Sequence, residues 1–208
     1  MSDLLERNVL VIDQKPKVIE VTNQYRILDE AGKDIGFIRE EGQSTAKKIF
    51  RFFSDVDQFL THRLAVYDRD GGKVLEMTRP AKVFKSKLEI RDDQGRAAGR
   101  IVQENLVGKK RFRLESAGGQ LLGSINAENW RSWDFSIQDR AGNEVGRITK
   151  NWAGTLTEAF TTADRYLLNI SGQVSPELRL LMVASAAGVD TALKQDDTGG
   201  VGLGGFDI

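Results

Sequence analysis

The chain has 208 residues, of which 40% are hydrophobic and 29% charged, enough for a sizeable core and a well-solvated surface. Thirty basic and thirty acidic residues cancel, which argues against general attraction to nucleic acid or anionic lipid, so any such attraction must come from a local patch. The absence of Cys excludes disulfides, thiolate chemistry and S-acylation. The first fifteen residues lack a signal-peptide pattern, so we expect a cytoplasmic protein.

The chain opens with a short apolar strand, Asn8–Ile12, and then repeats a unit of strand, turn and strand five times. The first strand of the unit typically ends in Asp, the turn contains Gly, and the second strand often opens with Gly. Asp and Gly adopt turn conformations that other residues resist, so each copy is predicted to be a β-hairpin. The copies begin at Tyr25, Leu64, Leu88, Phe112 and Phe135.

The fifth copy shows the hairpin most clearly. Phe135 and Ile137 alternate with polar residues before the turn Asp139–Asn143, so they should face one side of the sheet. Val145 and Ile148 should face the same side after the turn, with some adjustment of the register. The carboxylates in these turns are expected to form the turns rather than a catalytic site.

An insertion, Glu41–Thr61, separates the first two hairpins. Its apolar residues recur at helical spacing, and basic residues lie near its N-terminal end. The only histidine, His62, follows it at the predicted start of a strand, where an ordinary structural role is expected.

A last short strand, Tyr166–Ile170, precedes a helix predicted over Ser175–Lys194. Ser175 can cap the helix, Pro176 suits its first turn, and no charge appears from Leu180 to Val189. A helix that is apolar on every side needs lipid or protein all around it. Its core is too short for a membrane span, which needs roughly 20 apolar residues, so we expect a helix enclosed by protein.

The strands and the helix explain each other. Five hairpins and two single strands predict a mainly β fold of about twelve strands, and regular short strands favour a closed antiparallel barrel. A barrel of about eight strands can be filled by its own side chains, whereas a wider one cannot. We therefore predict that the C-terminal helix lies buried at the centre of the barrel. The fold would be one domain over residues 1–194, followed by a disordered Gly-rich tail over 195–208.

Several motifs go beyond generic hairpins. Thr78-Arg79-Pro80 closes the second hairpin, Lys150-Asn151-Trp152-Ala153-Gly154 follows the fifth, and Glu158–Asp164 leads into the last strand. In this order, and followed by an apolar helix, they resemble the phospholipid scramblase family and more broadly the LURP-one-related and tubby-like group. The resemblance covers roughly Asn8 to Leu193 and implies a twelve-stranded barrel around a buried C-terminal helix.

The chain departs from this family in its expected calcium loop. The loop of animal scramblases is rich in acidic residues and corresponds to Thr162–Gln173, where Asp164 is the only remaining acidic position. One carboxylate cannot supply the roughly six to eight oxygen ligands that calcium takes, so we expect no metal site and no calcium-triggered scrambling. No nucleophile elbow, Walker loop or zinc-protease motif is present, so we predict no catalytic residues, no cofactor and no enzymatic activity.

Two basic stretches are candidates for binding lipid headgroups or a protein partner. The insertion combines Lys47, Lys48 and Arg51 with Phe52 and Phe53, a composition that suits an interfacial helix, although its aromatic face could instead cap the barrel. The second stretch opens a strand and could instead be a solvated edge; it contains Lys109, Lys110 and Arg111.

The leading hypothesis is a non-enzymatic, scramblase-like barrel in the cytoplasm that associates with the surface of phospholipid membranes or with a membrane-linked partner. The alternative is a soluble structural or protein-interaction module with no lipid role. Neither hypothesis involves nucleic acid, and the sequence leaves the oligomeric state open.

Overall fold

The computed structural model describes residues 2–13, 24–41, 62–80, 87–105, 110–129, 134–150 and 165–193. A short helix, α1 (Asp3–Glu6), precedes the strands, and a long one, α3 (Pro176–Leu193), follows them. The strands are β1 (Val9–Asp13), β2 (Gln24–Leu28), β3 (Asp34–Glu41), β4 (His62–Asp68), β5 (Lys73–Arg79), β6 (Lys87–Asp92), β7 (Ala97–Gln103), β8 (Arg111–Ser116), β9 (Leu121–Asn129), β10 (Asp134–Asp139), β11 (Glu144–Thr149) and β12 (Arg165–Ile170).

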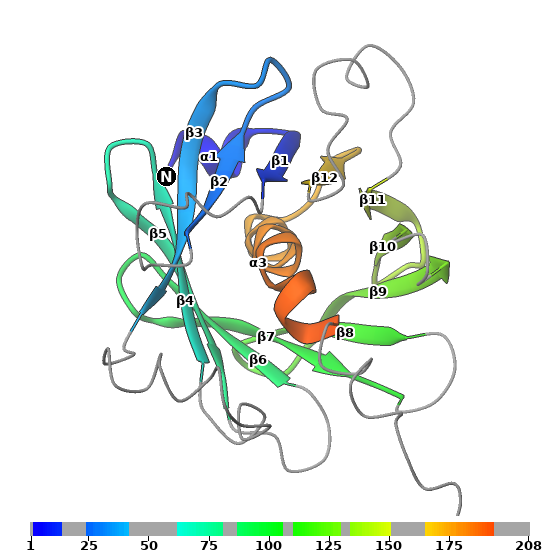
Figure 1. The fold of residues 1–208 in the computed structure, drawn as a ribbon. Coiled ribbons are helices and arrows are strands. Elements are labelled where there is room, and N and C mark those ends of the chain that lie inside the picture. The colour runs from blue at the N-terminus through cyan, green and yellow to red at the C-terminus, as the bar shows by residue number, and fades with distance from the viewer. Residues whose placement is uncertain are drawn as a thin grey trace, which may run out of the picture.

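The twelve strands form one closed antiparallel barrel, as the sequence predicted. Each strand pairs with its neighbours in the chain, and β1 closes the ring by pairing with both β12 and β2. Figure 1 shows α3 inside the ring of strands. The first and last strands each differ by one residue from the predicted bounds, and the insertion after Glu41 lies outside the described residues.

Five tight turns join the hairpins. Each places a glycine at a positive φ, between 76° and 85°, where a residue with a Cβ would be strained. These glycines are Gly32, Gly71, Gly95, Gly119 and Gly142. In four of the turns the preceding Asp carboxylate accepts backbone N–H bonds; Asp139 Oδ1, for example, accepts from Ala141 N at 2.8 Å and Asn143 N at 2.9 Å. The turn carboxylates therefore have the structural role that the sequence predicted.

A β-bulge follows the inward-facing residues of the fifth hairpin. Phe135 pairs with Ile148 and Ile137 with Gly146, and the register then shifts between Ile137 and Gln138. Phe135, Ile137, Val145 and Ile148 all lie in the main core, which confirms the predicted facing and its adjustment. All five hairpins contain the same bulge, one strand residue before the turn Asp or, in the fourth hairpin, before Ser116.

The helix α3 is buried on all sides along its middle. Every residue from Leu181 to Ala187 is at most 3% exposed, and the hydroxyl of Ser185 donates to the Leu181 carbonyl oxygen at 2.6 Å. Ser175 caps the helix as predicted, because its Oγ accepts from Leu178 N at 3.2 Å. The apolar helix thus packs against the inward residues of the barrel in one continuous core.

Glycines on the second strands of the hairpins let neighbouring backbone and the helix come close. A Cβ built on Gly146 would lie 2.7 Å from the Asn169 carbonyl oxygen and 2.5 Å from Met182 Cε of α3. Gly36, Gly99 and Gly123 occupy the equivalent positions, and a Cβ there would also meet a backbone oxygen of the adjacent strand below 3.0 Å. The glycine that often opens the second strand is therefore a packing requirement of the barrel.

We expect Gly146→Ala to destabilise the fold, by about 1–3 kcal/mol, because the added methyl group overpacks the contact between β11, β12 and α3. Gly118→Ala is the matched control, since the nearest atom to a Cβ there is Ser116 Oγ at 3.8 Å. Urea unfolding of both variants and the parent checks this, and equal midpoints for all three would contradict it.

The turn carboxylates also predict a pH dependence. Hydrogen bonds, first from the Asn143 side chain and then from Asn143 N, hold the pKa of Asp139 below its ordinary value. A folded pKa below the unfolded one contributes stability at neutral pH that is lost as pH falls from about 4 through the folded pKa. Asp139→Asn keeps an acceptor oxygen but cannot ionise, so its unfolding midpoint should change less between pH 5 and pH 3 than that of the parent. An identical pH profile would contradict this assignment.

Candidate functional site

The two ends of the barrel differ in construction. All five tight turns lie at one end, the turn end, where α1 and the start of α3 also lie. The strand directions place all the remaining connections between strands at the opposite end, which we call the connection end. The strands that end there do so at Asp13, Glu41, Arg79, Gln103, Asn129 and Thr149. The two ends are therefore the first places to compare for function.

The N-terminal segment closes the turn end. Leu4 and Leu5 of α1 are 1% and 8% exposed and belong to the main core. Arg179, in the first turns of α3, donates to the Leu5 carbonyl oxygen at 3.3 Å, to the Arg7 carbonyl oxygen at 2.9 Å and to Asn8 Oδ1 at 3.0 Å. These bonds hold the segment before β1 against the helix.

The sequence-predicted binding residues divide into two groups. Lys47, Lys48, Arg51, Phe52, Phe53 and Lys109 lie outside the described residues, as does Asp164. Lys110 and Arg111 are described, and they lie where β8 begins, at the connection end. Arg111 is exposed, and its Nε donates to Asn126 Oδ1 of β9 at 2.9 Å.

The idea that this second basic stretch is a sheet edge is wrong, because β8 pairs with β7 on one side and β9 on the other. Its outward charges are instead paired with acidic residues on the same strand and beside the neighbouring one. Arg113 lies 3.6 Å from Glu104 and 3.3 Å from Glu115, and Arg100 Nε also donates to Glu115. The exterior of β7 and β8 is thus a paired surface, with Lys110 and Arg111 at its connection end.

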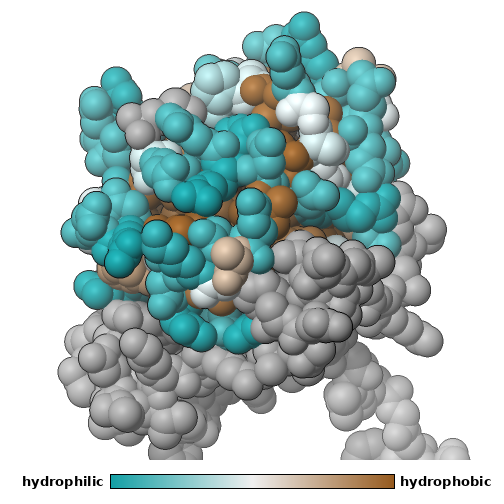
Figure 2. Space-filling view, turned by 90° about the horizontal axis from the view of Figure 1, so that it is seen from above, coloured by the Kyte–Doolittle hydropathy of each residue, from teal (hydrophilic) through white to brown (hydrophobic). Residues whose placement is uncertain are grey.

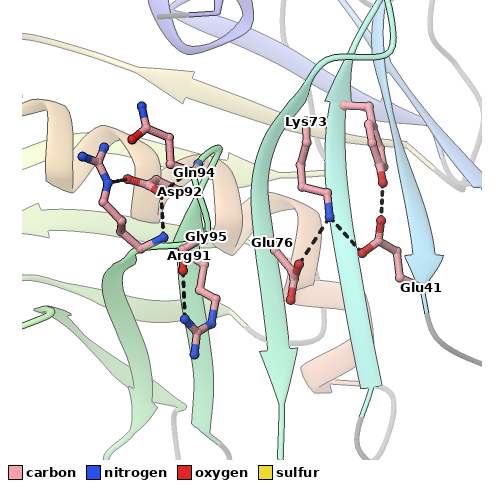
Figure 3. Close-up of polar contacts among 9 residues, drawn as sticks. Glu41, Lys73, Glu76, Arg91, Asp92, Gln94 and Gly95 are labelled. Carbon is pink, nitrogen blue, oxygen red and sulfur yellow. Dashed lines mark hydrogen bonds and ion pairs between the residues drawn. The ribbon is translucent and has the colours of Figure 1, made fainter.

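An aromatic and ionic cluster covers the outside of β3, β4 and β5, and Figure 3 shows its ionic contacts among Glu41, Lys73 and Glu76. The rings of Phe37 and Tyr67 stack with centroids 5.0 Å apart, and the guanidinium of Arg39 lies 5.2 Å from the Phe37 centroid. Glu41 accepts from the Tyr67 hydroxyl and from Lys73 Nζ, the latter at 3.1 Å. Burial acts to raise the pKa of Glu41, but these two hydrogen bonds together with the positive charges of Lys73 and Arg39 bring it below its ordinary value.

A second exterior cluster lies where β1 closes the barrel. Asp13 is fully buried there and forms ion pairs with Arg26 of β2 at 2.8 Å and Arg165 of β12 at 3.0 Å. Beside it, Val11, Leu28 and Leu167 form a small apolar cluster separate from the main core. Figure 2, which views the molecule from above the orientation of Figure 1, shows a narrow apolar band between hydrophilic residues.

Sequence reasoning missed both exterior clusters. Asp13 and Arg165 are adjacent only because the first and last strands pair, and no local pattern signals that pairing. Phe37, Arg39 and Glu41 occupy alternate positions along β3, which could have indicated an outward face. Which residues of β4 and β5 lie beside them is set by the register of the three strands, which the sequence does not show.

Neither a metal centre nor a membrane span occurs within the part of the chain that the structure describes. There, no three His, Asp or Glu side chains gather in a way that could hold a metal ion. The described helices are also too short or too polar to cross a membrane.

Comparison with known proteins finds relatives of this chain in two yeasts and in human. The chain is 27% identical over 185 residues to a phospholipid scramblase family protein of Schizosaccharomyces pombe, covering 81% of this chain and 47% of the relative. It is 24% identical over 181 residues to altered inheritance rate of mitochondria protein 25 of Saccharomyces cerevisiae, covering 74% and 54%. It is 22% identical over 203 residues to phospholipid scramblase family member 5 of Homo sapiens, covering 88% and 72%.

The chain thus spans about half the length of the two yeast relatives. No solved structure matches it. The model of the Scramblase family matches residues 1–193, which include every described strand and α3. With a closed barrel, an enclosed C-terminal helix and this match over nearly its whole length, the chain belongs to the phospholipid scramblase family.

Proposed function

We propose that this protein is a non-enzymatic barrel that binds the surface of phospholipid membranes from the cytoplasm. Its membership of the phospholipid scramblase family supports an interaction with phospholipid. In this proposal α3 stays in the barrel, because its apolar side chains already contact the inward residues of the strands. Binding therefore uses side chains on the outside of the barrel.

The observation that carries the proposal is that both predicted basic stretches join strands at the connection end. The insertion leaves β3 after Glu41 and returns at His62, and the second stretch lies between Gln103 of β7 and Arg111 of β8. Stretches separated by about fifty residues in the sequence are thus attached to the same end of the molecule.

The proposed contacts are electrostatic and interfacial. A Lys or Arg near an anionic membrane surface contributes about 1 kcal/mol, so several must act together for stable binding. The two stretches supply six basic side chains, together with aromatic side chains that suit the boundary between headgroups and acyl chains. The proposed basic residues are Lys47, Lys48, Arg51, Lys109, Lys110 and Arg111, and Phe52 and Phe53 are the proposed aromatic ones.

Co-sedimentation with vesicles tests the proposal. The protein should bind vesicles containing phosphatidylserine more tightly than vesicles of phosphatidylcholine alone. The double variant Lys47→Glu/Lys48→Glu should bind the anionic vesicles at least roughly tenfold more weakly, since each lost cation removes about 1 kcal/mol of attraction.

The matched control reverses two charges at the turn end, in Arg69→Glu/Arg140→Glu. Both of these arginines are exposed in hairpin turns, and this variant should retain most of the binding. A folded parent protein that binds neither kind of vesicle would overturn the proposal. If it captured a protein partner without lipid, the alternative of a soluble interaction module would be favoured.

We further expect binding to be independent of calcium. Thr162 and Gln173 stand at positions that are acidic in the calcium loops of animal scramblases, which leaves Asp164 as the one carboxylate that this stretch offers to calcium. Vesicle binding should be equal in chelator and in millimolar calcium, with magnesium at the same concentration as control. Stimulation by calcium but not by magnesium would contradict this expectation.

A further inference from the structure

Arg111, the first residue of β8, differs from its neighbours on the barrel exterior in what its guanidinium contacts. Its Nε donates to Asn126 Oδ1 at 2.9 Å, and the Glu104 carboxylate lies 4.0 Å from the same Nε. Among the described residues, none accepts a hydrogen bond from its two terminal nitrogens, Nη1 and Nη2. With its side chain 58% exposed, Arg111 therefore presents two donor groups that a ligand can reach from solvent.

Two other arginines of the exterior already bind carboxylates of the chain. Arg113 lies two residues further along β8, with its Nε 3.6 Å from Glu104 and its Nη2 3.3 Å from Glu115. Arg147 of β11 makes a two-point contact with Glu144, from Nε at 2.9 Å and from Nη2 at 2.8 Å. An anion from solution would have to displace these carboxylates, whereas no described carboxylate occupies the terminal nitrogens at the start of β8.

The backbone around Arg111 is held on both sides. Its N–H donates to Asn105 Oδ1 at 2.9 Å, and its carbonyl oxygen accepts from Glu104 N at 2.8 Å. The carbonyl oxygen of Lys110 accepts from Ala127 N at 3.0 Å. The start of β8 therefore keeps one position relative to β9 and to the end of β7.

Two polar side chains of β9 set the direction of the Arg111 side chain. Asn126 lies directly opposite Arg111 in the pairing of β8 with β9. Its Nδ2 donates to Ser124 Oγ at 3.2 Å, which turns its Oδ1 toward Arg111 Nε. Because the guanidinium is planar, a bond at Nε also sets the direction of the terminal N–H groups. A group that is already ordered loses less conformational freedom when it binds a ligand.

We infer that Arg111 binds the phosphate group of an anionic phospholipid through its two terminal nitrogens, with Asn126 and Ser124 as positioning residues. The inference rests on the proposed phospholipid binding and adds which group of the lipid is bound and by which residue. A guanidinium donates two parallel hydrogen bonds to phosphate oxygens, which the ammonium of a Lys cannot reproduce. Lys110 adds a second positive charge next to Arg111 in the chain.

The chemistry of this contact favours a phosphate monoester, as in phosphatidic acid. The terminal oxygens of a monoester are all free to accept hydrogen bonds. In phosphatidylserine the phosphate is a diester with serine attached, which leaves fewer free oxygens. A contact made by the paired donors of Arg111 should therefore distinguish the two lipids, whereas a contact made by positive charge alone should depend on the charge density of the vesicle surface.

Co-sedimentation with vesicles of phosphatidylcholine that contain either phosphatidic acid or phosphatidylserine tests this contact. Arg111→Lys keeps the charge and loses the paired donors, so it should bind the phosphatidic acid vesicles about fivefold more weakly than the parent. It should bind the phosphatidylserine vesicles nearly as well as the parent. Arg113→Lys is the matched control on the same face of β8, and it should change neither affinity, because this guanidinium is already paired with Glu104 and Glu115.

A double-mutant cycle tests the role of Asn126. Asn126→Ala removes the acceptor for Arg111 Nε without changing any charge, and alone it should weaken binding to phosphatidic acid vesicles about threefold. In the Arg111→Lys background the same substitution should cause no further loss, because the group that it positions is already absent. An equal loss in both backgrounds would overturn the positioning role, since Asn126 would then act on the fold or on another contact.

The outcomes separate this contact from the proposed function. Equal effects of Arg111→Lys and Arg113→Lys, or an equal loss with both lipids, would overturn the phosphate contact and leave lipid binding intact. Displacement of the parent from vesicles by millimolar inorganic phosphate, but not by chloride at the same ionic strength, would overturn the lipid headgroup as the ligand in favour of free phosphate. Absence of binding by the folded parent to either kind of vesicle would overturn the proposed function and the contact with it.

Discussion

The width of a twelve-stranded barrel is the constraint on which the rest of this structure depends. A ring of that size encloses more space than its own side chains can fill, so something apolar must occupy the centre. The residues of α3 from Leu181 to Ala187 meet this need on every side of the helix. Gly99, Gly123 and Gly146 complete the fit, because a Cβ at each would collide with neighbouring backbone, and each lies against a side chain of α3.

A filled barrel moves function to the surface. The interior holds one continuous core, and the turn carboxylates are occupied by backbone N–H groups of their own turns. Much of the exterior is also matched by charge, as at Arg113 with Glu104 and Glu115. The antiparallel topology separates the two ends of the barrel along the axis, and both basic stretches predicted from the sequence join strands at one of these ends.

Local signals predicted most of the fold. Hairpins could be recognised because the Asp and Gly of each turn act within a few residues, and the cap at Ser175 is equally local. The candidate site was harder to predict from the sequence than the fold was. Asp13, Arg26 and Arg165 come together only when the first and last strands pair, and Tyr67 reaches Glu41 only through the register of β3 and β4. Reading Lys110 and Arg111 as a possible edge failed because β8 pairs with both of its neighbours in the chain, β7 and β9.

By itself the sequence determined the strand count, the turn positions, the need for an enclosed helix and the family, because each depends on residues close together in the chain or on their total number. The tertiary structure decided which strands close the barrel, which side chains form the exterior clusters and which end each connection occupies. The physical reason is that these depend on pairing between residues far apart in sequence. The helix α3 depends on both the sequence and the tertiary structure, since its composition required an apolar enclosure and the ring of strands supplied it.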